Sequence, residues 1–365
     1  MKKIGVITFS DTTHNYGQIL QCFAMQQTLK RLGFNPFLIR FNTATKSSYK
    51  NLSLKSKFIK IISTLSYYIH NLSSKEQISL TPKTKEPDRH FEQFIKKYIN
   101  TTYYKTINEI YSNPPIADAI ICGSDQIWGT GIPLYYLDFI KDKRTKKIAY
   151  APSFGGVKFN MLDLLKIRLL IKNFKHISVR EEDGIRICKK CGRNDAIVVP
   201  DPTLILPINE YKKIVSKKLV PQNDYVFVYM LKNSTNFDIF SFEKEANQKG
   251  FQVIYVTANG LEDNHSKIYP TIEEWLGLIE NASYVVTNSF HCSVFSILFN
   301  KNFQINRLIG QCEKMNMRFD NLIKHYNLNF SNSIFDTKIN YSKINQTIIE
   351  DSEKYTKMLN SWLAQ

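Results

Sequence analysis

The sequence lacks any apolar stretch close to the ~20 residues that a membrane-spanning helix needs. Its first residues, MKKIGVITFS, contain two lysines but no long apolar region behind them, which favours a buried first strand over a signal peptide. The six cysteines are scattered without the spacing of a disulfide framework, as is typical of reduced thiols in a cytoplasm. We therefore expect a cytoplasmic protein, either free or in peripheral contact with the inner membrane.

Recognised catalytic and metal-binding patterns are also absent. The chain has no H-E-x-x-H, D-x-D, G-x-S-x-G or G-x-G-x-x-G motif, so metal-dependent sugar transfer and serine hydrolysis have no motif support. CKKC at 188–191 has the spacing of half a zinc site, but a structural zinc needs four ligands and His176 is the only nearby histidine. We interpret these cysteines as ordinary thiols at the end of a helix, and we predict neither metal nor cofactor.

Acidic residues are fewer than basic ones, 32 against 49, which leaves a net charge of +17. Such a balance favours anionic partners: nucleic acid, acidic lipid or phosphorylated small molecules. Nucleic acid is the least favoured of these, because zinc-finger spacing, aromatic-rich ribonucleoprotein motifs and basic-region heptads are missing. A solvated lysine-rich surface explains much of the charge without any partner.

The 365 residues are enough for two domains. The first 42 residues predict strand, turn, helix and strand, the βαβ pattern of a parallel sheet. The helix QILQCFAMQQTL carries no charge, so we expect it to be buried against a sheet or at a domain interface. Further strands are predicted in DAIICGSDQIW, KIAYAPSFG, HISVREEDG and AIVVPDPTLIL, with HFEQFIKKYI as a helix.

Residues 43–90 interrupt this alternation with a segment rich in Lys, Ser and Thr. It contains the island FIKIISTLSYYI, and we predict a partly helical insertion. It is either a flap over the first domain or a basic amphipathic contact with a membrane surface or acceptor.

A second alternating set follows, with strands in YVFVYMLK, FQVIYVTANG, YVVTNSF and NFQIN. The Pro-containing stretch 204–222 separates the two sets. We therefore predict an α/β protein with doubly wound domains at 1–205 and 222–342. A C-terminal amphipathic helix at 343–365 buries a stripe that includes Ile344, Ile348, Tyr355, Met358, Trp362 and Leu363.

Ligands of open α/β sheets bind beyond the carboxyl ends of the strands. This rule selects short segments that follow predicted strands: Asn15 to Gln18, Gly123 to Trp128, Ser153 to Gly155, Arg180 to Asp183, Asp201 to Thr203, and Asn288 to His291. The candidates for substrate binding among them are Asn15, Tyr16, Gly17, Gln18, Ser124, Asp125, Gln126, Ser153, Asn288 and Ser289. The segment THNYGQ resembles a phosphate or substrate loop, although Gly17 can also serve only to permit the turn.

His291 lies between a strand ending at Thr287 and an apolar helix predicted over 292–299. The positive end of a helix dipole stabilises anions, so the place suits a phosphate or carboxylate beside a histidine that transfers protons. A capping or packed histidine is the alternative. Arg180 ends a strand and can bind such an anion in a planar, bidentate manner, or else form a surface salt bridge with Glu181 or Glu182.

Six segments together resemble the polysaccharide pyruvyltransferase family. They are ITFSDTTHNYGQILQCFAMQQTLKRLG, ICGSDQIW, YAPSFG, SVREEDG, VPDPTLIL and TNSFHCSVFSILFNKNF, and their order and spacing make the match specific. The resemblance implies two Rossmann-like domains in a GT-B-like arrangement with an interdomain cleft. It also implies transfer of a pyruvyl group from phosphoenolpyruvate to two sugar hydroxyls, giving a ketal, with Arg180 and His291 as the catalytic residues.

Ser289 departs from the family pattern, because many members have an arginine there. The change removes one anion ligand, and Arg318 is our candidate to replace it. The expected partners are phosphoenolpyruvate and a sugar acceptor, lipid-linked or free. Two other functions stay open: a GT-B-type glycosyltransferase with a nucleotide-sugar donor, and a non-catalytic protein that binds anionic glycans.

Overall fold

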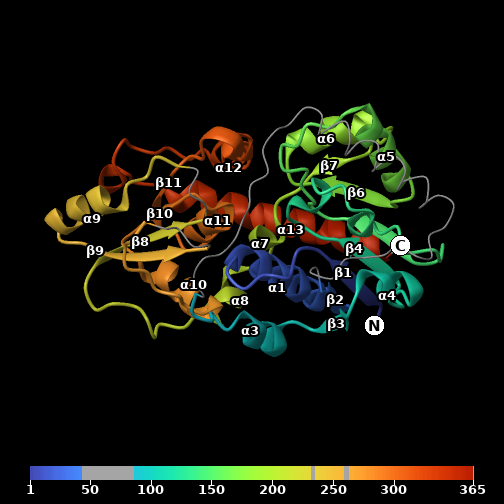
Figure 1. Ribbon diagram of the computed structural model, residues 1–365, viewed down its shortest axis with the longest axis horizontal. Helices are drawn as coiled ribbons and strands as arrows, with labels where there is room; N and C mark the ends of the chain where they lie inside the picture. The colour runs from blue at the N-terminus through green and yellow to red at the C-terminus, as the bar shows by residue number, and fades with distance from the viewer. Residues whose placement is uncertain (43–85, 232–234, 259–262, 365) are drawn as a thin grey trace.

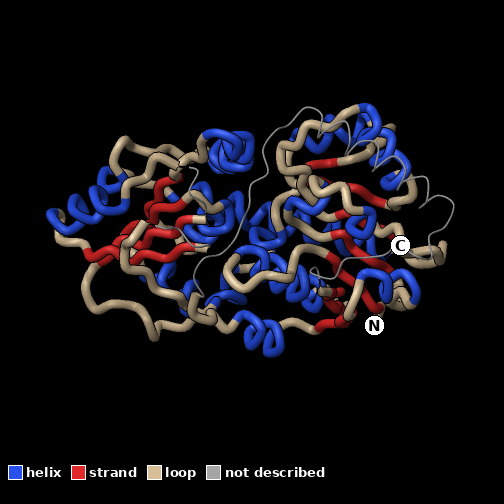
Figure 2. The backbone as a smooth tube through the Cα atoms, viewed as in Figure 1, coloured by secondary structure: helices blue, strands red, loops and turns tan. Residues whose placement is uncertain are grey.

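The computed structural model describes residues 1–42, 86–231, 235–258 and 263–364. Most of the predicted insertion, residues 43–85, therefore lies outside the described residues, as does the amphipathic contact assigned to it. Within the described part, the strands form two separate sheets, visible as two groups of red segments in Figure 2. None of the helices in this part is long and apolar enough to span a membrane.

The N-terminal sheet has seven strands in the order β3-β2-β1-β4-β5-β6-β7, and every neighbouring pair is parallel. The strands are β1 (Lys3–Ile7), β2 (Asn35–Phe41), β3 (Thr101–Tyr104), β4 (Ala119–Cys122), β5 (Lys146–Ala149), β6 (His176–Val179) and β7 (Ile197–Val198). Residues of β1 and β4 point alternately into two hydrophobic clusters, so both faces of the sheet are covered. The covering helices are α1 (Tyr16–Arg31), α3 (Phe91–Tyr98), α4 (Ile107–Ser112), α5 (Met161–Ile171) and α6 (Glu182–Lys190), with short 3₁₀ turns η1 (Gln126–Trp128) and η2 (Pro133–Tyr136).

The C-terminal sheet has four parallel strands in the order β11-β10-β8-β9. They are β8 (Tyr225–Met230), β9 (Gln252–Thr257), β10 (Tyr284–Thr287) and β11 (Asn302–Ile305). The helices between and after them are α9 (Ile239–Gln248), α10 (Ile272–Asn281), α11 (Phe290–Leu298) and α12 (Met317–Tyr326), with 3₁₀ turns η3 (Gly310–Asn316) and η4 (Ile334–Asp336). The predicted α/β alternation is confirmed in both halves.

Two short helices, α7 (Pro202–Ile205) and α8 (Ile208–Lys212), connect the sheets, and the long helix α13 (Tyr341–Ala364) returns across the junction. Figure 1 shows α13 in red, running from the C-terminal domain to the N-terminal one. The Ser352 hydroxyl donates to the Ile205 carbonyl, and Lys2 Nζ donates to the Leu363 carbonyl at 2.8 Å. The two ends of the described chain are therefore joined.

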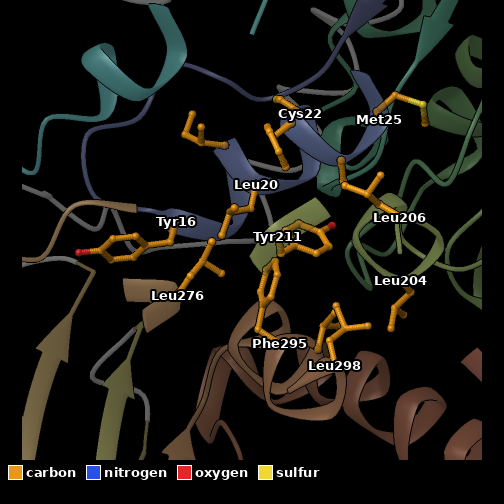
Figure 3. Packing of buried hydrophobic residues seen from close by; sticks show 14 of the residues in the cluster. Tyr16, Leu20, Cys22, Met25, Leu204, Leu206, Tyr211, Leu276, Phe295 and Leu298 are labelled. Atoms are coloured by element: carbon orange, nitrogen blue, oxygen red, sulfur yellow. The ribbon is translucent and has the colours of Figure 1, made fainter. Parts of the chain in front are cut away.

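Helix α1 carries no charge before Lys30, and this part is buried at the junction, as its composition predicts. One hydrophobic cluster runs without a break from this helix through α7 into α11 and α10, as Figure 3 shows. In it, Tyr211 packs edge-on against Phe295 with ring centres 5.0 Å apart, and Tyr16 stacks on Trp275 at 4.9 Å. The two domains share a core, which fixes their relative placement and brings the carboxyl ends of both sheets together.

Candidate active site

Asp201 is the centre of the polar groups at the junction. It follows β7, is 1% exposed and caps α7, in which Pro202 takes the first helical position. Its Oδ1 accepts hydrogen bonds from the Thr203 amide and hydroxyl, and its Oδ2 accepts from the Ser124 hydroxyl at 2.6 Å. The sequence rule for strand ends included this segment, but only the structure shows that the carboxylate joins side chains from both domains.

Arg180 directly follows β6 and is 6% exposed. Its Nε donates to Glu181 Oε1 at 2.9 Å, and its Nη1 lies 3.3 Å from Asp201 Oδ2. The predicted pairing with Glu181 is therefore present, but the pair is buried and not on the surface as that alternative supposed. Burial alone would lower the pKa of Arg180, but Glu181 and Asp201 raise it, so the guanidinium is firmly charged. Its Nη2 is buried and has no hydrogen-bond partner.

Arg318, on α12, brings a second guanidinium from the C-terminal domain. The guanidinium carbons of Arg180 and Arg318 lie 5.0 and 5.8 Å from the centre of the Phe290 ring. Arg318 Nε donates only to the Met315 carbonyl, and among the described residues this arginine makes no ion pair. Burial and the like charge of Arg180 lower the pKa of Arg318 to about 10. Glu181 and Asp201 pair with Arg180, whereas Arg318 is buried without an ion-pair partner among the described residues, so its guanidinium can take an anionic ligand.

His291 reaches the same point from the first turn of α11, which begins at Phe290 and not at residue 292 as the sequence predicted. Ser289 is the N-cap, and its hydroxyl accepts from the Cys292 amide, so polar capping extends the helix backwards. His291 is 6% exposed, and its Nε2 lies 3.5 Å from Asp201 Oδ2. Arg180 and His291, far apart in sequence, therefore meet on one carboxylate oxygen.

Gly17 makes this approach possible. A Cβ atom built on Gly17 would lie 2.2 Å from His291 Nδ1 and 2.6 Å from His291 Cβ. Any side chain here would push α1 and α11 apart. The absence of a side chain at Gly17, in the THNYGQ segment, therefore leaves the space that His291 of the other domain occupies.

The ionisation of Asp201 follows from its neighbours. Burial raises the pKa of Asp201, but His291, Arg180 and the Ser124 hydroxyl together hold it well below its usual range. Asp201 is therefore a carboxylate at neutral pH and not a proton donor. Its position lets it orient the His291 ring.

The segment after β4 supports the site through its backbone. Asp125 has a left-handed φ of 85°, its side chain accepts from the Gln126 amide, and its carbonyl accepts from the Ser153 amide at 2.8 Å. A non-glycine residue in this conformation is held by its surroundings. Ser153 in turn accepts from the Gly155 amide, and the Gln126 side chain lies beneath Gly155.

Four predicted substrate-binding residues lie elsewhere. Tyr16 is fully buried and donates to the Pro270 carbonyl, so it joins the domains by packing. Asn288 Oδ1 accepts from the Leu231 amide at the end of β8. Asn15 occupies the N-cap of α1 without a side-chain capping bond, and Gln18 lines a separate pocket of about 280 Å³.

Arg180 and Arg318 line a pocket of about 490 Å³ between the domains. Asp201 and Phe290 line it as well, whereas His291 lies behind Asp201 and is not part of its lining. The volume is within the range of small-molecule sites. The guanidiniums of Arg180 and Arg318 both lie over the ring of Phe290, which was not among the residues predicted from the sequence. Its position between Ser289 and His291 is the only sequence signal for it.

The cysteines of CKKC are buried at the end of α6, and burial raises the pKa of Cys188 to about 12 and that of Cys191 to about 11. In the described residues, no group of three or more His, Cys, Asp or Glu side chains is arranged to hold a metal ion.

Solved structures of other proteins have a similar fold. UDP-N-acetylglucosamine 2-epimerase from Rickettsia bellii matches 100% of this chain and 97% of its own, with a TM-score of 0.51 and 12% identity. The UDP-GlcNAc 2-epimerase of Methanocaldococcus jannaschii matches 99% of this chain and 100% of its own, with a TM-score of 0.50 and 12% identity. At this identity the likeness concerns the fold alone: two Rossmann-like domains in a GT-B-like arrangement, as predicted.

The family follows from the sequence itself. The model of the family described as polysaccharide pyruvyl transferase matches residues 15–303, most of the chain. The protein therefore belongs to this family. No curated protein sequence matches the chain.

Proposed function

We infer that the protein transfers a pyruvyl group from phosphoenolpyruvate to two hydroxyls of a polysaccharide or lipid-linked sugar. The products are a cyclic ketal and inorganic phosphate. Family membership supports a transferase of this kind. The observation that carries the donor assignment is the pair of buried guanidiniums, Arg180 and Arg318, close to one aromatic ring.

Phosphoenolpyruvate fits this pair because it carries a phosphate and a carboxylate on the same carbon atom. Guanidinium groups bind both anions with paired, charge-assisted hydrogen bonds. Arg318 has no carboxylate partner among the described residues, and Arg180 has one buried N–H group without an acceptor. Binding a dianion here removes the repulsion between two like charges, so the donor stabilises the site that it enters. Many family members have an arginine at the position of Ser289, but here Ser289 caps α11. We therefore assign the role of the second donor-binding cation to Arg318.

His291 is the proposed acid. Asp201 separates His291 from the pocket in this structure, so the imidazole has to turn past Asp201 to reach the donor. There it protonates the methylene carbon of the donor, which gives a methyl group and an oxocarbenium-like centre at the neighbouring carbon. The first sugar hydroxyl attacks this centre, phosphate then leaves, and the second hydroxyl attacks to close the ketal. One hydroxyl proton goes to a base and the other departs with phosphate. Protonation by a positioned acid contributes about 10²–10⁴-fold.

Asp201 is the positioning residue for this acid. Its carboxylate lies 3.5 Å from His291 Nε2 and 3.3 Å from Arg180 Nη1, so it fixes the acid relative to the donor-binding group. Its lowered pKa keeps it a carboxylate, so it can accept from the imidazole and from Arg180 and cannot itself be the acid.

The test uses His291→Asn and Arg180→Lys, with Arg144→Lys as the control because Arg144 forms an exposed pair with Asp142. Thermal-shift titration measures phosphoenolpyruvate binding, and phosphate release measures turnover. We expect His291→Asn to bind the donor normally while turnover falls by about 10²-fold or more. Arg180→Lys should weaken donor binding, because lysine keeps the charge but loses the planar fork. Arg144→Lys should change neither.

Three results contradict the proposal in whole or in part. If nucleotide sugars stabilise the protein and phosphoenolpyruvate does not, the protein is a glycosyltransferase of the same fold. If an anionic glycan binds and no phosphate is released from the donor, the protein is a binding protein. If His291→Asn instead loses donor binding and keeps turnover at saturation, His291 is an anion ligand and the acid lies elsewhere.

A further inference from the structure

The pocket of about 490 Å³ extends beyond the two arginines to a wall built by α12 and α13. Lys324, His325 and Tyr326 of α12 and Tyr355 of α13 line this wall, which we name the outer wall. None of these residues was among the candidates from the sequence. The outer wall is the part of the pocket that the donor-binding arginines do not occupy.

His325 is the reactive group of the outer wall. Its Nε2 lies 2.6 Å from Asp351 Oδ2, and Asp351 is buried on α13. A carboxylate at this distance holds the ring proton on Nε2, which leaves the lone pair on Nδ1. The His325 side chain is 47% exposed, so a ligand in the pocket can reach it. A histidine oriented by a buried carboxylate is an arrangement suited to accepting a proton from a hydroxyl.

Tyr326 adds a second polar group. It is 4% exposed, its ring packs edge-on against His325 at 4.7 Å, and its hydroxyl is buried without a hydrogen-bond partner. Buried hydroxyls normally have a partner, and Tyr326 lines the pocket, so a small movement of its ring would let a ligand there supply one. An unsatisfied tyrosine beside an oriented histidine suits a ligand that carries several hydroxyls.

We propose that the outer wall binds the acceptor, a neutral pyranose residue with two free hydroxyls, and that His325 takes the proton of the attacking hydroxyl. The proposal rests on the pyruvyl transfer proposed above. As the acceptor oxygen bonds to the cationic carbon of the donor, its O–H bond breaks and the proton passes to His325 Nδ1. Asp351 positions the ring and stabilises the charge that forms. His291 and His325 thus act on opposite sides of the reaction, one as acid and the other as base.

The lining favours a neutral sugar over a charged one. Lys324 and Glu182 bring opposite charges to the pocket, and Leu322 and Tyr355 offer apolar surface. Sugar rings combine apolar faces with hydroxyl edges, which matches this mixture. A strongly anionic acceptor would instead compete with the donor for the two arginines.

The test compares His325→Asn and Asp351→Asn with His90→Asn. His90 is the matched control because it also pairs with an aspartate, Asp88, and its side chain is 48% exposed. It precedes α3, which lies far from α12 in Figure 1, and its left-handed φ of 56° suits asparagine. The acceptor probes are the methyl glycosides of glucose, galactose and mannose, each with saturating phosphoenolpyruvate. The readouts are donor binding by thermal shift, phosphate release, and the position of the sugar in crystals soaked with donor and glycoside.

We expect His325→Asn to bind phosphoenolpyruvate as the wild type does, while turnover with the best glycoside falls by about 10²-fold. Asp351→Asn should lower turnover about tenfold with an unchanged KM for the donor, which a purely structural change would not do. His90→Asn should have no effect. The sugar should lie against His325 and Tyr326.

Three results overturn the acceptor assignment while leaving the donor proposal intact: unchanged turnover in His325→Asn, a sugar bound elsewhere, or no glycoside bound in the presence of donor. Failure of the wild type to bind phosphoenolpyruvate is a different result, because it contradicts the proposed function itself.

Discussion

Replacing Gly17 by alanine tests whether the contact between α1 and α11 sets the geometry of the site. The new Cβ atom would lie 2.6 Å from His291 Cβ and 2.2 Å from His291 Nδ1. Carbon atoms in contact prefer separations of about 3.5–4.0 Å, so the two helices or the imidazole must move by roughly 1 Å. The clash involves the Cβ of His291 as well as its ring, so a rotamer change alone cannot relieve it.

The expected effects follow from that displacement. Overpacking of this kind costs about 1–3 kcal/mol of stability, even though alanine is favoured over glycine within a helix by up to about 1 kcal/mol. A misplacement of about 1 Å in a catalytic group costs on the order of 10²-fold in rate. We therefore expect Gly17→Ala to be modestly less stable and at least 10-fold slower in phosphate release.

Urea unfolding and phosphate release from phosphoenolpyruvate measure the two effects. Lys30→Ala is the control, because Lys30 is an exposed residue of the same helix. A Gly17→Ala protein with wild-type stability and turnover would show that α1 and α11 are not held as the structure has them. A large loss of stability without a change in the rate of phosphate release would show that the contact between α1 and α11 stabilises the fold but does not affect catalysis.

Asp201→Asn should cost about 3 kcal/mol at neutral pH, because Arg180 loses one of its two buried carboxylates. The folded-state pKa of Asp201 is lowered, so its contribution to stability is fully present above the unfolded-state pKa of about 4 and is lost as the pH falls from there toward the folded-state pKa. Urea unfolding at several pH values should show this dependence of stability on pH in the wild type and less of it in the variant. Arg318→Met should leave stability unchanged or raised, because it removes a buried unpaired charge, while affinity for phosphoenolpyruvate falls about 10- to 100-fold; equal donor affinity would exclude Arg318 from the site. Calorimetry should show one unfolding transition for both domains, and Trp275→Ala should lower its midpoint as a whole; two resolved transitions would contradict a shared core.

The fold was predictable because its signals are local. Strand and helix periodicity identified both parallel sheets, and the lack of charge in α1 before Lys30 indicated its buried place at the junction. The sequence placed the start of α11 at residue 292, whereas the helix begins at Phe290. The polar segment before residue 292 was interpreted as a turn, and the ability of the Ser289 hydroxyl to cap the helix was not considered.

The site was predictable only in part. Arg180 and His291 follow strands, and the topology of parallel sheets brings strand ends together. The rule does not tell which polar residues point into the site. It selected Tyr16, which joins the two domains, and Asn288, which accepts from the Leu231 amide within the C-terminal domain. Phe290 and the pair His325–Asp351 depend on side chains that meet across elements, and no spacing in the sequence records such contacts.

The shared core explains how a site with two like charges is tolerated. Arg180 and Arg318 come from different domains, and their repulsion favours separating the two halves of the site. Opposing this, Tyr16 and Trp275 stack across the junction, and aromatic side chains of this size bury about 150–250 Å² each. At about 25 cal/mol per Å², each contributes roughly 4–6 kcal/mol as an upper estimate, enough to offset a like-charge pair that is partly neutralised by Glu181 and Asp201. The apolar junction thus holds the arginines together before the donor arrives, and the relief of their repulsion becomes part of the free energy of donor binding.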